Sequence, residues 1–125
     1  MMTGEIHRLI LEYARARSFG FETNEREAVE ALWECPGRAA GKVTTWSLQR
    51  ALTCLQRYAR RPIFQTPNEQ EASPLETAFL QLLQCLGAGR TDEARRRATF
   101  LLKPDGIDSF LSALTPAATT VAKAA

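Results

Sequence analysis

The sequence predicts an all-α protein: a single-domain bundle of five or six helices with a proline-rich connector between two halves. Three observations predict this fold class. Apolar residues recur at the three- and four-residue spacing of one helix face along most of the chain. Alternating β-branched runs are absent, and valine occurs only three times in 125 residues. Prolines, glycines and capping residues divide the chain into segments of helix length.

The N-terminal half, residues 1–62, is predicted to hold three helices. Residues 5–17 form the first, with Arg15 on its solvent side, and Gly20 ends it with a left-handed cap. Residues 24–34 form the second, with Asn24 as cap. A loop over residues 35–43 leads to the third helix, residues 45–61, which Thr44 or Thr45 caps and Pro62 ends.

An exposed connector, residues 62–73, leads to a helical hairpin and a short helix within residues 74–115. Ser73, Pro74 and Glu76 form a strong helix start. The predicted helices cover residues 75–86, 91–103 and 105–114. Residues 1–115 are thus expected to form one domain, and residues 116–125, with little to bury, a flexible tail.

Composition excludes several classes of protein. The chain is 45% hydrophobic and 24% charged, which suits one soluble core. No apolar run is long enough to span a bilayer, and the start does not resemble a signal peptide. We therefore expect a cytoplasmic protein with no membrane partner.

No motif of catalysis, metal binding or cofactor binding is present. The three cysteines, Cys35, Cys54 and Cys85, form no CxxC pair, and His7 is the only histidine. The glycine-rich stretch at residues 86–97 lacks the lysine and the preceding strand of a phosphate loop, and Asp92 and Glu93 would repel phosphate. We expect this stretch to be the turn of a helical hairpin, and the protein not to be an enzyme.

Charge is distributed unevenly. Residues 1–34 have a net charge of −3 and residues 69–125 of −1. Residues 35–68 contain no acid and six bases: Arg38, Lys42, Arg50, Arg57, Arg60 and Arg61. In the predicted third helix, Arg50, Arg57 and Arg61 align in one stripe opposite the leucines, with Arg60 beside it and Trp46 at its start.

Two interpretations of these bases compete. In the first interpretation, the bases contact an anionic partner and Trp46 serves as an aromatic anchor. Alternatively they are solvated or pair with acids of the first two helices (Glu22, Glu25, Glu30 and Glu34), and Trp46 folds over the core edge.

The leading functional hypothesis is a non-enzymatic protein-interaction module: an adaptor, a regulator or a small subunit of a complex. The candidate partner-binding residues are Arg38, Lys42, Trp46, Arg50, Arg57, Arg60 and Arg61. The alternative is nucleic-acid binding through the basic face of residues 45–61. Against DNA recognition, the predicted loop before this helix is longer than the three- or four-residue turn of a helix-turn-helix. The partner, the pathway and the oligomeric state stay open.

Overall fold

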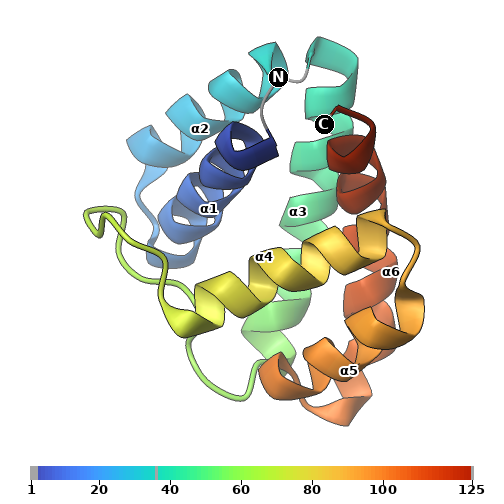
Figure 1. Ribbon diagram of the computed structural model, residues 1–125. Coiled ribbons are helices and arrows are strands. Elements are labelled where there is room, and N and C mark those ends of the chain that lie inside the picture. The colour runs from blue at the N-terminus through green and yellow to red at the C-terminus, as the bar shows by residue number, and fades with distance from the viewer. Residues whose placement is uncertain (1–2, 36, 125) are drawn as a thin grey trace.

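The computed structural model describes residues 3–35 and 37–124, and in these residues the chain forms six helices and no strand (Figure 1). The helices are α1 (Thr3–Phe19), α2 (Glu22–Glu34), α3 (Arg38–Tyr58), α4 (Pro74–Gly87), α5 (Thr91–Leu101) and α6 (Pro104–Ala124). This confirms the predicted all-α bundle. None of these helices is both long and apolar enough to cross a membrane.

The long helices α3 and α6 pack against each other and form the centre of the bundle. The helix pair α1–α2 covers α3 on one side, and the hairpin α4–α5 covers α6 on the other (Figure 1). The largest fully buried side chains come from both halves: Ile6, Ile10, Leu32, Leu48, Phe79, Leu82, Leu83, Leu101, Leu102, Phe110 and Leu114. One core therefore joins the two halves.

The predicted loop over residues 35–43 is wrong, because α3 begins at Arg38 and only residues 35–37 separate it from α2. Gly41, which falls within that predicted loop, is a helical residue at the crossing of α2 and α3. A Cβ atom at Gly41 would fall on the backbone of Leu32 and Trp33. Glycine is therefore required here by close helix packing, and Thr44 and Thr45 are interior helix residues and not caps.

The predicted flexible tail is also wrong for residues 116–124, because α6 continues through Pro116 to Ala124, while residue 125 lies outside the described residues. Proline removes one helical N–H and usually disrupts a helix. Here the Ser47 hydroxyl of α3 supports the adjacent turn: it donates to the Ala113 carbonyl at 2.5 Å and accepts from the Ala117 N–H at 3.0 Å. Ala117, Ala118 and Val121 are then buried in the core.

The connector between α3 and α4 lacks helix, as predicted, but it is not fully exposed. Ile63 and Phe64 are buried, and the Phe64 ring packs edge-on against Phe79 with centroids 5.2 Å apart. The connector begins with a short backbone pairing in which Arg60 N–H donates to the Leu101 carbonyl at 3.0 Å.

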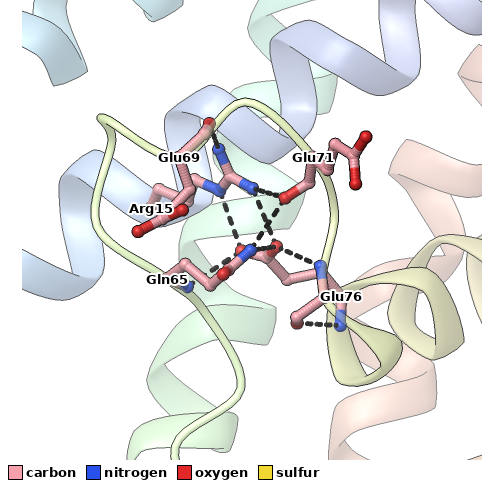
Figure 2. A network of polar contacts seen from close by, with 6 residues as sticks. Arg15, Gln65, Glu69, Glu71 and Glu76 are labelled. Atoms are coloured by element: carbon pink, nitrogen blue, oxygen red, sulfur yellow. Dashed lines mark hydrogen bonds and ion pairs between the residues drawn. The ribbon is translucent and has the colours of Figure 1, made fainter.

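A buried polar network holds the rest of the connector (Figure 2). Arg15 of α1 reaches the Glu76 carboxylate with two hydrogen bonds of 2.8 Å and also donates to the carbonyls of Glu69 and Glu71. Glu76 additionally accepts from the Gln65 backbone and side chain and from the Ser73 N–H. The predicted capping box of Ser73 and Glu76 is present.

The placement of Arg15 on the solvent side of its helix was therefore wrong, because this side chain is only 4% exposed. Helical periodicity does put Arg15 opposite the apolar stripe of α1, but the connector folds over that face. The charge is buried and paired, and each of the three guanidinium nitrogens donates at least one hydrogen bond, as is typical of buried ions in proteins.

Candidate functional site

Helix α3 presents one continuous exposed face along its whole length, which we name the α3 face. Its members follow each other at three- and four-residue steps, so they lie in one stripe. They are Arg38, Lys42, Trp46, Gln49, Arg50, Thr53, Gln56 and Arg57, and all are exposed. The opposite side of α3, including Leu48, Ala51, Leu52 and Leu55, is buried in the core. The fold therefore fixes the α3 face outward and leaves it without any acidic residue.

Aromatic rings orient three of the cations around this face. The Arg50 guanidinium lies over the Trp46 ring at 4.8 Å from its centroid, and the Arg57 guanidinium lies 5.3 Å from the centroid of Tyr58. The Lys42 ammonium lies 5.2 Å from the centroid of Trp33. Such contacts are worth about 0.5–1 kcal/mol at exposed sites. They limit the motion of the cations and leave their N–H groups able to bind an anion.

Internal ion pairing does not account for these cations. In residues 3–35 and 37–124, no ion pair involves Arg38, Lys42, Arg50, Arg57 or Arg61. Glu25 of α2, one of the proposed internal partners, pairs with Arg17 at 3.2 Å instead. Pairing with acids of the first two helices is therefore excluded for these cations. They are either solvated or bound to a partner.

The structure separates Arg60 and Arg61 from the α3 face, which corrects the predicted stripe. Helix α3 ends at Tyr58, and Ala59 already has an extended backbone with ψ 140°. The Arg60 Nε donates to the Thr99 carbonyl at 2.9 Å. Arg61 is exposed in the connector. The chain leaves the helix early because residues 59–60 pair with the end of α5.

Trp46 is not folded over the core edge. It lies in α3, as predicted, but in the third turn of the helix instead of the first, and it is 53% exposed. Together with Gln49, Arg50 and Thr53 it lines a shallow depression on the α3 face. An exposed tryptophan with a stacked arginine is the kind of side-chain pair that contributes most to interfaces.

A larger groove of about 840 Å³, which was not predicted, lies beside the α3 face. It is bounded by the end of α1, the start of α2, the second half of α3 and the connector. Its lining includes Phe19, Leu52, Leu55, Ile63 and Phe64 as apolar residues and Arg17, Arg60, Arg61, Glu22 and Glu25 as charged ones. Thr53 lines both this groove and the Trp46 depression, so the two lie next to each other.

The glycine-rich stretch at residues 86–97 contains the turn between α4 and α5 and the first half of α5, and several of its charges are paired within the protein. Glu93 accepts from the Cys85 thiol at 2.7 Å and lies 3.7 Å from Arg90 and 4.0 Å from Arg97. Arg95 pairs with Asp108 at 2.5 Å. Burial and the Glu93 carboxylate both raise the pKa of the Cys85 thiol, which keeps it protonated. Three of its four arginines are thus paired with acids of the protein itself.

The short link between α2 and α3 removes one objection to DNA binding. Only residues 35–37 separate the helices, a length compatible with a helix-turn-helix. Helix α2 is nevertheless strongly acidic, with glutamates at positions 22, 25, 27, 30 and 34. In a helix-turn-helix the helix before the recognition helix crosses the phosphate backbone, where this charge would be repelled.

Comparisons with known proteins add no assignment: no protein family matches the chain, and no curated protein or solved structure proves similar to it. Among the described residues, no group of three or more His, Cys, Asp or Glu side chains could hold a metal ion. The α3 face and the adjoining groove are thus the strongest candidate site on the molecule.

Proposed function

We propose that the protein is a non-enzymatic interaction module that binds an acidic segment of a partner protein on the α3 face. One observation carries this proposal: α3 presents an acid-free stripe of cations that form no ion pair within the described part of the chain and that are oriented in part by aromatic rings. Arginine guanidinium groups bind carboxylates with two parallel hydrogen bonds. The exposed Trp46 supplies apolar contact in the middle of this charge.

The acidic helix α2 favours a protein over duplex DNA. A duplex is broad, and docking on α3 would bring its phosphates close to the glutamates of α2. An extended peptide is narrow enough to follow the α3 face alone. Single-stranded nucleic acid is the remaining alternative, because bases stack on exposed aromatic side chains such as Trp46.

A selection from displayed random twelve-residue peptides on the immobilised protein tests the proposal. We expect the retained peptides to be enriched in Asp and Glu, and their affinity to fall as salt is raised because exposed charges are screened. Random single- and double-stranded oligonucleotides form the second arm, at about 150 mM salt, the ionic strength at which exposed charges beyond roughly 8 Å are screened.

Enrichment of acidic peptides without retention of oligonucleotides supports the proposal. Retention of single-stranded oligonucleotides, with no acidic enrichment among the peptides, would overturn it in favour of nucleic-acid binding. Peptides enriched only in apolar residues would overturn it as well, because the cations of α3 would then contribute nothing to recognition.

A further inference from the structure

We propose that the groove between α1, α3 and the connector binds an apolar side chain of the same acidic segment, a few residues away from its acids. This inference rests on the proposed function and specifies the partner further: an acidic peptide with one large apolar anchor. The α3 face would bind the acids, and the groove would bind the anchor.

The groove has the size and lining for such an anchor. Its volume of about 840 Å³ falls within the range of ligand pockets, about 300–1,000 Å³. Leu52, Leu55, Ile63 and Phe64 form an apolar floor. Phe19, at 47% exposure, is an apolar ring at the edge of the groove that an inserted side chain would cover.

Charge around the groove fixes the side from which an acidic segment enters. Arg60 and Arg61 line it where α3 ends, and Thr53 and Gln56, two uncharged residues of the α3 face, line it as well. The opposite side carries Glu22 and the ion pair of Arg17 with Glu25, whose charges offset each other. An acidic segment is therefore attracted to the α3 side, where no acid accompanies the cations, so its anchor enters with its acids lying toward Arg50 and Arg57.

The geometry of α3 limits the spacing between the acids and the anchor. With a rise of about 1.5 Å per residue, Trp46 and Gln56 lie roughly 15 Å apart along the helix. An extended peptide advances about 3.3 Å per residue, so roughly four or five residues cover that distance. Acids next to Trp46 and Arg50 thus require an anchor about four residues away.

Four synthetic peptides in a Gly/Ser background test this arrangement by fluorescence anisotropy. The first has three consecutive glutamates and a leucine about four residues after them, the spacing set by the helix rise. The second has the reverse order, because the structure does not fix the chain direction. The third and fourth repeat these two peptides with serine in place of leucine.

The protein variants are Gln56→Trp, which fills the groove from an exposed helix position, and Gln84→Trp, a matched exposed glutamine on α4 outside the groove. Arg50→Glu with Arg57→Glu serves as the variant of the α3 face. We expect one leucine peptide to bind the unaltered protein about tenfold more tightly than its serine form, as burial of a leucine side chain predicts. This difference should persist in Gln84→Trp and disappear in Gln56→Trp.

An equal affinity of leucine and serine peptides for the unaltered protein, or an undiminished difference in Gln56→Trp, would overturn the groove assignment. In that case loss of peptide binding in the Arg50→Glu, Arg57→Glu variant would leave the proposed function standing. If no glutamate peptide binds the unaltered protein, both proposals fail.

Discussion

Arg15 and Glu76 form a two-pronged buried ion pair, in which Arg15 Nε and Nη2 each lie 2.8 Å from a different oxygen of the Glu76 carboxylate. Helix α1 is thereby joined to the start of α4, and the connector passes over the pair with its carbonyls turned toward Arg15 (Figure 2). The same connector supplies Ile63 and Phe64 to the groove. The shape of the candidate site therefore depends on this pair.

The first prediction concerns the stability that this pair provides. Arg15→Met leaves the Glu76 carboxylate buried without its cation, and removal of one partner of a buried pair costs about 3–5 kcal/mol. Urea denaturation measures the loss. Arg8→Met is the control, since Arg8 and its partner Glu12 are both exposed and such pairs contribute about 1 kcal/mol or less. Equal effects of the two substitutions would contradict the assigned role of Arg15.

The second prediction concerns acid. Burial alone would raise the pKa of Glu76, but hydrogen bonds from Arg15, Ser73 and Gln65 outweigh it and lower the pKa to about 2. The unfolded chain, with an ordinary pKa near 4.5 for this carboxyl, takes up the proton first as the pH falls. The stabilisation is thus complete above about pH 4.5 and is lost progressively toward pH 2. Below pH 4.5, the free energy of unfolding measured with urea should fall more steeply with decreasing pH in the unaltered protein than in Glu76→Gln. The same pH dependence in both proteins would contradict the lowered pKa of Glu76.

The third prediction tests the contact between α2 and α3. In Gly41→Ala the new Cβ would overlap the Leu32 carbonyl and lie 2.5 Å from Trp33 Cα. Helix backbones cannot give way as a flexible side chain does, so we expect a loss of about 1–3 kcal/mol. Gly4→Ala is the control, because no atom lies within 4 Å of its Cβ position. A neutral Gly41→Ala variant would mean that α2 and α3 are farther apart than described.

The fourth prediction concerns α6 beyond Pro116. Ser47→Ala removes the hydroxyl that bridges Ala113 and Ala117 and leaves buried backbone groups unpaired, at a cost of about 1–3 kcal/mol. Ser109→Ala, on the exposed side of α6, should change stability by roughly 0.5 kcal/mol or less. Thermal unfolding followed by circular dichroism compares the two. Equal melting temperatures would show that Ser47 does not support the helix.

These residues show why the sequence predicted some features and not others. The presence of six helices and the Ser73–Glu76 cap follow from local patterns and were predicted correctly, whereas the ends of α3 and the end of α6 were not. Gly41, Pro116 and Arg15 were misjudged, because each depends on a partner distant in sequence: the backbone of α2, the hydroxyl of Ser47 and the connector with Glu76. Glycine and proline are locally breaking residues, and only tertiary packing reverses that tendency.

The candidate site divides in the same way. The acid-free stretch and the stripe containing Arg50 and Arg57 could be predicted, because charge and helical spacing are local properties. Arg61 was placed on that stripe because nothing in the sequence marks the end of α3 at Tyr58, where the chain pairs with α5. The groove could not be predicted, since four separate segments form it.

Charge reversal on the α3 face tests acid binding most directly. The variant Arg50→Glu, Arg57→Glu is compared with Arg26→Glu, Arg96→Glu, which changes the net charge equally at exposed positions elsewhere. The measurement is the dissociation constant of an acidic peptide retained in the display selection, together with the melting temperature of each variant. We predict at least about a tenfold loss of affinity, or 1.4 kcal/mol, for the α3 variant alone, with both melting temperatures nearly unchanged. Equal affinity losses in both variants would show an effect of net charge only. Unchanged affinity in the α3 variant would place the binding surface elsewhere. Either result contradicts the binding of acidic segments on the α3 face.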